Sequence, residues 1–459
     1  MSAVPSDRQR GPLLISALPL PPGQIAATRR LLPWFSPRYL GLLSLIFAGC
    51  AVRVWLIYRY NPLDHIWSDP QRHWEQGVDV LRLDPMSMID PIMYQLYIGA
   101  LAKLTLKVPV LVVFYTAALS LIGPWLWYRF LRELLPSRTL ALTGWVLLVW
   151  LPSWSVIYSY FMQETLMLPL LGGALWATWR CRRKGDTGSF VIALLVWVLA
   201  GLTRGICIPI AAVAMSWLWF AQAHKTERAA ISLLVLAGIL GPLSVRSFHA
   251  THMLAPHGVG AMVQLYQRSG AREILIDFKR EGARWNYGFT SPGMLQQPFE
   301  PLSDWQSARQ GSVHFFIDLD AGSRSWEEAK ATIPWNWPRA IDLAKENLIY
   351  LFFSESWPDS NQTRLVGQVN HWLRWVWVPL SLGCLFLSIR LRRRQGERLL
   401  PTIILTWFLV QGLFPLSVNE GRYRKPFEGL LIAQCLLLAG SLMRPKMLKS
   451  ASASEGLVA

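Results

Sequence analysis

The stretch YLGLLSLIFAGCAVRVWLIY, residues 39–58, is an apolar run interrupted by a single charged side chain, that of Arg53. A helix of roughly 20 apolar residues is long enough to cross the hydrocarbon core of a bilayer. Similar runs follow along the chain, and we expect about ten spans in all. The predicted spans cover residues 39–58, 108–129, 139–157, 164–180, 188–202, 205–220, 229–248, 372–390, 399–418 and 427–443.

The composition supports a membrane protein. Of 459 residues, 53% are hydrophobic and only 16% are charged, whereas soluble domains carry about 25% charged residues. The 24 tryptophans suit the membrane–water interface, where indole rings are enriched. A single water-soluble core, a disulfide-stapled secreted domain and a disordered chain are therefore excluded. The net charge of +17 does not indicate a nucleic-acid partner, because the cations fall in short clusters between apolar runs.

Clusters of Lys and Arg predict the orientation, since cytoplasmic loops collect these residues. If all six clusters lie on one side, both termini are cytoplasmic. The stretch 188–220 has basic clusters on both sides and is too long for one helix, so we expect two short helices hinged near residues 201–205. The clusters are Arg29/Arg30/Arg38, Arg129/Arg132/Arg138, Arg180/Arg182/Arg183/Lys184, Lys225/Arg228, Arg390/Arg392/Arg393/Arg394/Arg398 and Arg444/Lys446/Lys449.

The predicted fold is thus an all-α, polytopic transmembrane helix bundle in the plasma (inner) membrane. Its parts are a cytoplasmic tail (1–38), a transmembrane core (39–248) with a first outer loop (59–107), a small extracytoplasmic cap (249–371), the C-terminal transmembrane helices (372–443) and a second cytoplasmic tail (444–459). Within the cap we expect helices near 323–332 and 339–353. The five cysteines lie in or beside apolar runs and form neither a disulfide framework nor a C-x-x-C metal pair.

The first outer loop contains the most informative polar pattern. Residues 65–78, HIWSDPQRHWEQGV, place Asp69, Arg72, His73 and Gln76 on one side of a helix and tryptophans on the other. Ser68 is expected to cap this helix. Such a helix would lie in the interface with its apolar face toward lipid and present Asp69 above the membrane. A lone Asp at this position is more often a helix cap, so the alternative stays open.

A second helical stripe follows Asp90 and Pro91, and it places Tyr94 in another interfacial helix. Two surface helices above a bundle are more typical of an active site than of packing. Glu164 begins a later apolar run on the same outer side, where it either favours the helix dipole or contacts substrate.

Positive charge also occurs on the side that should lack it. Arg422 and Arg424 lie in the outer loop 419–426, and Arg204, Arg246 and Arg53 lie at the outer ends of predicted spans. Ionisable groups at this depth are costly and mark functional sites. Several arginines at one level predict a receptor for a phosphate di-anion. Pairing with acidic neighbours or lipid headgroups is the alternative for each arginine.

The sequence contains none of the common motifs of nucleotide-binding enzymes, zinc proteases or serine hydrolases. The chain has no Walker loop, H-E-x-x-H, G-x-S-x-G or G-x-G-x-x-G signature, so nucleotide-driven chemistry is not expected. Asp69 with His73, or His65 with Asp69, could hold a divalent metal, but two ligands at this spacing are too few to assign one. No cofactor and no metal ligand are therefore assigned.

The order of these features resembles the GT-C superfamily of integral-membrane glycosyltransferases. The chain resembles in particular the bacterial branch related to protein O-mannosyltransferases and the lipid A aminoarabinose transferase. The likeness runs from about residue 39 to 443 as a series of short motifs. These are the early Asp69, Pro91-Ile92-Met93-Tyr94, Pro152 with Tyr158-Ser159 and Glu164, Gly201-Leu202-Thr203-Arg204, Pro242-Leu243-Ser244-Val245-Arg246, Leu265-Tyr266 and Arg422-Tyr423-Arg424-Lys425-Pro426.

The resemblance implies transfer of a sugar from a polyprenyl-phosphate donor to a lipid, glycan or protein acceptor at the extracytoplasmic face, with inversion. It implies that Asp69 is the base. Arginines would bind the donor phosphate, and we assign Arg204, Arg246, Arg422 and Arg424 to this role; His73, Asp90, Tyr94, Glu164 and Tyr266 are assigned to substrate contacts. The chain departs from the family where Pro70 and His73 replace an acidic residue and a tyrosine, and where Ser247 replaces an asparagine.

Two other functions compete with the enzyme. A transporter or flippase of an anionic lipid or lipid-linked sugar could line its path with the arginines, but the halves of the chain show no pseudo-symmetry. A non-catalytic anchoring subunit would explain the spans but not Asp69 on a polar helix face. The membrane lipid and the lipid-linked donor are the expected partners.

Overall fold

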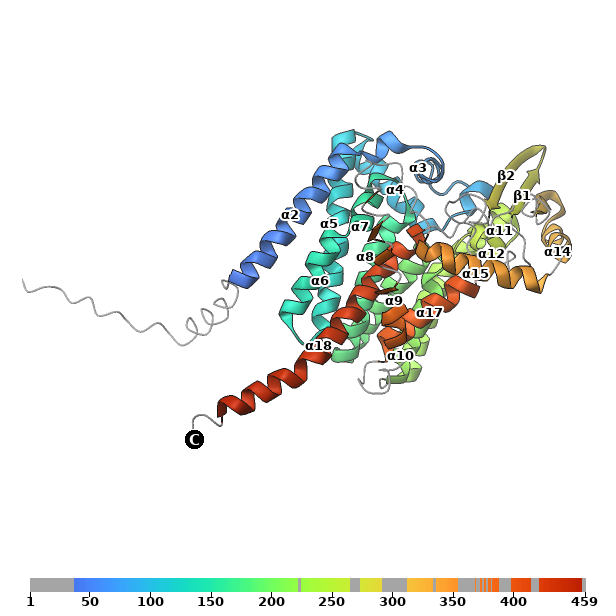
Figure 1. The fold of residues 1–459 in the computed structure, drawn as a ribbon. Coiled ribbons are helices and arrows are strands. Elements are labelled where there is room, and N and C mark those ends of the chain that lie inside the picture. The colour runs from blue at the N-terminus through green and yellow to red at the C-terminus, as the bar shows by residue number, and fades with distance from the viewer. Residues whose placement is uncertain are drawn as a thin grey trace, which may run out of the picture.

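The computed structural model describes residues 37–221, 224–264, 273–290, 312–332, 336–353, 398–413 and 421–455, together with short pieces between 368 and 387. The described chain is mostly helical, and a small sheet lies at one end of the helix bundle (Figure 1). The predicted helical character is therefore confirmed, but the all-α class is wrong.

The bundle is built around α5, which packs lengthwise against α8, while α8 in turn packs against α9 (Figure 1). α2 and α6 pair beside them, and α10 packs on α17. The bundle helices are α2 (Pro37–Arg59), α5 (Pro109–Leu134), α6 (Arg138–Trp150), α8 (Gln163–Lys184), α9 (Thr187–Thr203), α10 (Cys207–Ala221), α11 (Lys225–Thr251), α17 (Leu399–Leu413) and α18 (Lys425–Glu455).

Among the described residues, three helices, α2, α5 and α11, are long and apolar enough to cross a membrane, and a bent pair supplies a fourth candidate. The pair consists of α6 and the segment Pro152–Ser159, which meet at 57°. Shorter apolar helices include α9, α10 and α17. α9 and α10 separate at residues 204–206, next to the predicted hinge. The ten crossings and the cytoplasmic termini stay predictions, and the span 372–390 is described only in short helical pieces.

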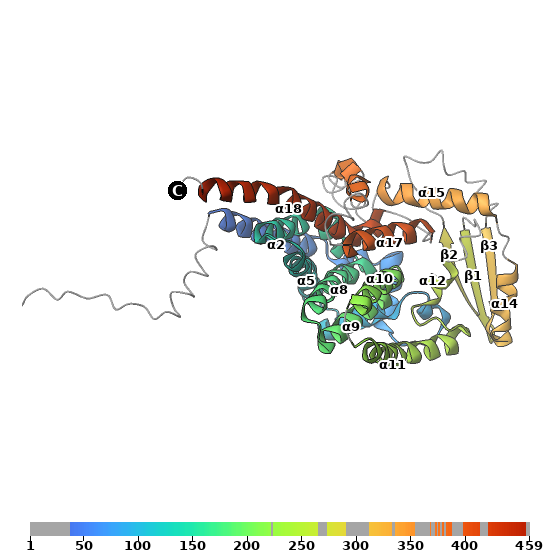
Figure 2. The same cartoon turned by 90° about the horizontal axis from the view of Figure 1, so that it is seen from below.

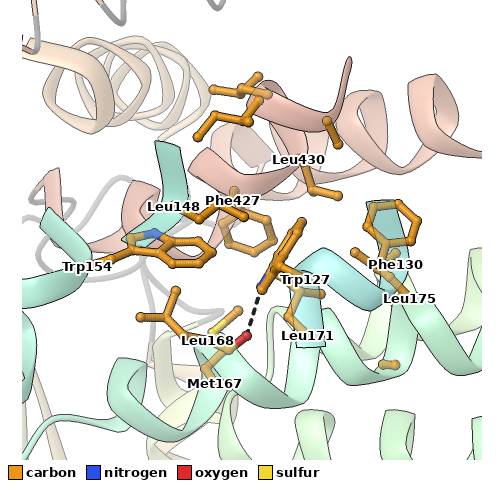
Figure 3. Packing of buried hydrophobic residues seen from close by; sticks show 14 of the residues in the cluster. Trp127, Phe130, Leu148, Trp154, Met167, Leu168, Leu171, Leu175, Phe427 and Leu430 are labelled. Atoms are coloured by element: carbon orange, nitrogen blue, oxygen red, sulfur yellow. Dashed lines mark hydrogen bonds between the residues drawn. The ribbon is translucent and has the colours of Figure 1, made fainter. Parts of the chain in front are cut away.

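The core of the bundle centres on Trp127 of α5, which is fully buried against α8 and α18 (Figure 3). Its indole nitrogen donates a hydrogen bond to the Leu168 carbonyl over 3.0 Å. Gly172 and Gly429 permit this close packing, because a Cβ at either position would lie within 2.8 Å of the indole ring. Small residues that let elements approach closely are typical of helix packing in membranes.

The guanidinium of Arg53, fully buried on α2, donates hydrogen bonds at two places where a proline interrupts helical hydrogen bonding. Pro124 inside α5 and Pro152 after α6 lack the N–H that would bond the carbonyls of Ser120 and Leu148. Arg53 donates to both of these carbonyls, over 3.2 and 2.8 Å. It also donates to two further carbonyls, those of Val149 over 2.7 Å and Trp154 over 3.1 Å.

The sheet overturns the all-α prediction. It has the order β2-β1-β3, with β1 (Glu273–Arg280) antiparallel to β2 (Ala283–Thr290) and parallel to β3 (Ser312–Asp318). A two-residue turn joins the first two strands, with Glu281 at φ 49° and Gly282 at φ 83°. Two positive φ angles in a two-residue loop suit the twist of a hairpin. α14 (Arg324–Ala331) packs on β3, and α15 (Trp337–Phe353) lies nearby (Figure 2), so both lie where the sequence predicts cap helices.

The cap shares its hydrophobic core with the first loop. The buried face of the sheet, from Ile274, Ile276 and Phe278, joins one cluster with Met88 and Ile89 of the loop. Trp326 of α14 belongs to the same cluster, and its indole donates to the Thr251 carbonyl at the end of α11 over 2.6 Å. The cap is therefore fixed to the first loop and to α11 by burial of apolar surface.

Replacing Arg53 by Met should lower the free energy of unfolding by about 3 kcal/mol or more, because buried carbonyls lose their donors. Pro124→Ala supplies the N–H that the Ser120 carbonyl lacks, so Arg53→Met should cost about 1 kcal/mol less in that background. Thermal denaturation of the four proteins of this double-mutant cycle measures the coupling. Strictly additive losses would contradict the role assigned to Arg53.

Candidate functional site

α3 (Asp69–Val78) carries the predicted base at its first position. Ser68 occupies the N-cap position with φ 56°, but its side chain makes no capping hydrogen bond, so the predicted Ser68 cap is wrong. The turn into the helix instead places Asp69 beside Arg72, three residues later. Arg72 Nη1 donates to Asp69 Oδ1 over 2.7 Å. Opposite charges at this spacing are neighbours on a helix.

The polar face of α3 points into the protein, which corrects the predicted outward orientation. His73 and Gln76 are buried, and Gln76 Nε2 donates to the Met86 carbonyl over 2.7 Å. The physical reason is that α4 (Ile92–Thr105) crosses α3 closely. A Cβ at Gly99 would lie 2.7 Å from the Gly77 carbonyl oxygen, so the two backbones almost touch.

Arg72 bridges two carboxylates. Besides Asp69, its Nε donates to Asp90 Oδ2 over 2.7 Å, and its side chain is 19% exposed. Asp69 is the more accessible carboxylate, with 24% of its side chain exposed against 11% for Asp90. Arginine suits this role because its planar fork can donate to two acceptors at once.

Asp90 is held from several sides. Gln163 Nε2, at the start of α8, donates to Asp90 Oδ1 over 3.0 Å. Gln95 Nε2 donates to the Asp90 carbonyl over 3.0 Å. The N–H of Gly260, in the short helix α12 (Val259–Gln264), donates to the carbonyl of Ile89 over 3.1 Å. First loop, bundle and cap therefore all contribute to the position of one carboxylate.

The charges in this cluster stabilise each other. Burial opposes the charge on Arg72, but Asp69 and Asp90 outweigh it and hold the pKa of the guanidinium well above its ordinary value. Burial alone would raise the pKa of Asp90; the charge of Arg72 and, to a smaller extent, His73 hold it below its ordinary value instead. Asp90 is therefore an anion at neutral pH rather than a proton donor.

His73 and Tyr94, both predicted substrate contacts, lie on the inner side of the cluster. The rings meet edge to face with centroids 5.2 Å apart. His73 Nδ1 lies 3.6 Å from Asp90 Oδ2, too far for a hydrogen bond. Burial lowers the pKa of His73 to about 4. Burial also raises the pKa of Tyr94, whose hydroxyl lies 3.4 Å from Thr165 Oγ1.

A second charged pair begins one residue further along α8. Glu164 is buried and accepts a hydrogen bond from Arg204, which lies in the break between α9 and α10. The guanidinium of Arg204 lies over the Tyr423 ring, 4.3 Å from its centre. Glu164 also lies close enough to act electrostatically on His73 and Tyr94. Adjacent residues of α8, Gln163 and Glu164, thus connect the Asp69 cluster to the Arg204 pair.

Tyr287 of β2 links the cap to the same site. The Arg72 guanidinium lies 5.0 Å from the centre of the Tyr287 ring, a cation–π arrangement. Tyr287 is also near enough to Tyr423 for the two hydroxyls to interact electrostatically. Burial raises the pKa of Tyr287 far above its ordinary value, so its hydroxyl stays protonated. Each arginine of the site therefore lies over a tyrosine ring.

The remaining predicted arginines have other partners. Arg246 Nη2 donates to the Arg82 carbonyl over 3.2 Å, and no described hydrogen bond or ion pair joins Arg246 to Asp69. Arg424 is buried, pairs with Glu428 over 3.1 Å and donates to the Leu351 carbonyl over 2.7 Å. Arg53, also expected to mark a site, binds backbone carbonyls.

Two predicted site residues cannot be placed. Arg422 belongs to the 3₁₀ helix η10 (Gly421–Arg424), but its side chain lies outside the described residues. Tyr266 also lies outside them. Among the described residues, no group of three or more His, Cys, Asp or Glu side chains could hold a metal ion.

The sequence argument missed Gln163, Tyr287 and the bridging role of Arg72. The i, i+3 spacing of Asp69 and Arg72 is a signal that could have shown their pairing. The alternation in β2, where Trp285 and Tyr287 share a face, could have shown the strand. No local signal shows that Gln163 reaches Asp90, because that contact spans 73 residues.

The arrangement combines a partly exposed carboxylate, fixed by an arginine, with a second arginine nearby on a tyrosine ring. A carboxylate in this state can accept a proton, and two guanidiniums can stabilise negative charge that develops on a bound group. The buried surroundings strengthen both effects, because charges interact more strongly where water is excluded.

His73 should make stability depend on pH. Its folded pKa of about 4 lies below its ordinary value of 6.5, so between these values the unfolded chain binds the proton that the folded chain excludes. Stability is therefore complete above about pH 6.5 and falls by up to about 3 kcal/mol as pH decreases toward 4. Denaturation as a function of pH measures this slope. His73→Gln should lack it; an unchanged slope would contradict the assignment.

Gly99→Ala should lower the free energy of unfolding by about 1–3 kcal/mol, because a methyl group at that position meets the backbone of α3. Gly238→Ala is the matched control on α11, where a Cβ would meet nothing within 4 Å; it should be neutral or stabilise by up to about 1 kcal/mol. Thermal melting of both variants tests the difference. Equal effects would contradict the close crossing of α3 and α4.

No known family model, curated protein or solved structure matches this chain.

Proposed function

We propose that this chain is a membrane-bound glycosyltransferase. It transfers a sugar from a polyprenyl-phosphate donor to a lipid, glycan or protein acceptor at the extracytoplasmic membrane face, with inversion at the anomeric carbon. The observation that carries the proposal is the position of Asp69: it is a partly exposed carboxylate, fixed by Arg72, in a network that reaches Arg204 through Gln163 and Glu164.

Cleavage of a glycosyl–phosphate bond builds positive charge on the sugar and negative charge on the leaving phosphate. In our proposal Arg204, with Arg72 as a second guanidinium, stabilises the phosphate as it departs. A guanidinium carries five N–H donors, so each arginine could donate to a donor phosphate while it keeps its carboxylate partner. Of the four phosphate-binding arginines of the sequence argument, this proposal uses Arg204 and adds Arg72; Arg422 stays a prediction, because its side chain lies outside the described residues.

Asp69 acts as the base in this proposal. An acceptor hydroxyl attacks the anomeric carbon while its proton moves to the Asp69 carboxylate, and the bond to the phosphate breaks on the opposite face. Asp69 suits this role better than Asp90 or Glu164, because it is the most accessible of the three carboxylates. Asp90 would fix the orientation of Arg72, and Tyr287 would cover the site from the cap.

Asp69→Asn should reduce donor turnover by about 10²–10⁴-fold, the range that general base catalysis contributes. Asp79→Asn is the matched control, because Asp79 directly follows α3 but does not belong to the Asp69 cluster. The Asp79 side chain is 67% exposed, and its carboxylate lies 3.7 Å from the guanidinium of Arg82. The measurement is release of polyprenyl phosphate from radiolabelled polyprenyl-phosphate sugars by purified protein supplied with membrane acceptors.

Wild-type turnover in Asp69→Asn, with normal membrane insertion, would remove Asp69 as the base. A wild-type protein that moves labelled donor across vesicle membranes without cleaving it would favour the transporter instead. A wild-type protein that neither cleaves nor moves the donor would favour an anchoring subunit.

A further inference from the structure

Two cysteines that are 51 residues apart in the sequence lie in contact. Cys384 belongs to a helical stretch at residues 382–387, and Cys435 lies on α18. Their sulfur atoms are 2.9 Å apart. A disulfide bond is roughly 2.05 Å long, so a movement of less than about 1 Å would bring the sulfurs to bonding distance. The other three cysteines lie on α2, α8 and α10.

The surroundings of the pair determine what can react with it. Cys384 is buried and Cys435 half-buried, and the helix neighbours of Cys384 are apolar. A large charged oxidant would have to lose its hydration to reach these thiols, which is costly. A small, uncharged disulfide meets no such barrier. The site therefore fits an apolar reagent that dissolves in the membrane.

We propose that Cys384 and Cys435 form an intramolecular disulfide by exchange with a small, apolar disulfide. One thiol loses its proton and attacks the reagent, so that a mixed disulfide forms and one small thiol leaves. The second cysteine then attacks the protein sulfur of that mixed disulfide and releases the other small thiol. Two S–H bonds of the protein break and one S–S bond forms; the two electrons and two protons end on the two small thiols.

The bond would close a chain segment that contains α17 and η10. This segment carries Tyr423, whose ring contacts Arg204, and Arg424, which pairs with Glu428. A disulfide stabilises a protein mainly by limiting the conformations of the unfolded chain. Oxidation would therefore make unfolding of the segment that brings Tyr423 to Arg204 less favourable, independently of what reaction the site performs.

The test is to treat the purified full-length protein in nanodiscs with dithiodipyridine, an uncharged aromatic disulfide. Intact mass and peptide mapping without reduction then identify the product. The expected product has lost two hydrogen atoms and contains one cross-linked pair of peptides, with Cys384 joined to Cys435. Stable pyridyl adducts on both cysteines, unreacted thiols at both positions, or a cross-link between another pair would overturn the proposal.

Variants provide the control. Cys50→Ser should keep the cross-link, because Cys50 lies on α2 outside the pair. Cys384→Ser should retain a pyridyl adduct on Cys435 and form no cross-link; Cys435→Ala serves the same purpose if that variant folds poorly. Oxidation should raise the melting temperature of the wild type and of Cys50→Ser only. An equal rise in Cys384→Ser would contradict a stabilising bond at this site.

Discussion

The arrangement of the helices depends on one buried guanidinium. Arg53 binds the carbonyls that Pro124 and Pro152 leave without a helical donor, and it thereby fixes α2 to α5 and to the bend after α6. In an apolar environment an unpaired carbonyl costs several kcal/mol, so the two prolines require such a donor. The bend directs the chain through Tyr158 to the start of α8, where Gln163 and Glu164 contact the candidate site.

Pairing of buried charge also explains why the arginines that the sequence places at one level have separate partners in the structure. An uncompensated ion in a low-dielectric interior is strongly disfavoured, so each buried arginine lies against a carboxylate or a set of carbonyls. Arg204 lies against Glu164, Arg424 against Glu428 and Arg53 against backbone. The described arginines that share a depth in the sequence therefore have different partners. Arg204 is connected to the network around Asp69 through Glu164 and the adjacent Gln163.

The sequence predicts the long helices well and their surroundings less well. The apolar runs that begin near Tyr39, Val108 and Ala229 are long enough to mark α2, α5 and α11, because length and hydropathy are local properties. The same periodicity separates the two faces of α3, but it cannot show which element covers each face, and α4 covers the polar one. The sheet was missed because its strands lie within a polar loop and because the pairing of β1 with β3 joins segments that are far apart in the sequence. Contacts such as that between Gln163 and Asp90 depend on the tertiary fold.

The shared core of the cap and the first loop restricts how a ligand could reach Asp69. Lifting the cap would expose Ile274, Ile276 and Phe278 to water, at a cost of roughly 2 kcal/mol for each side chain. In the proposed function, the lipid-linked donor would therefore have to reach Asp69 without displacement of the cap.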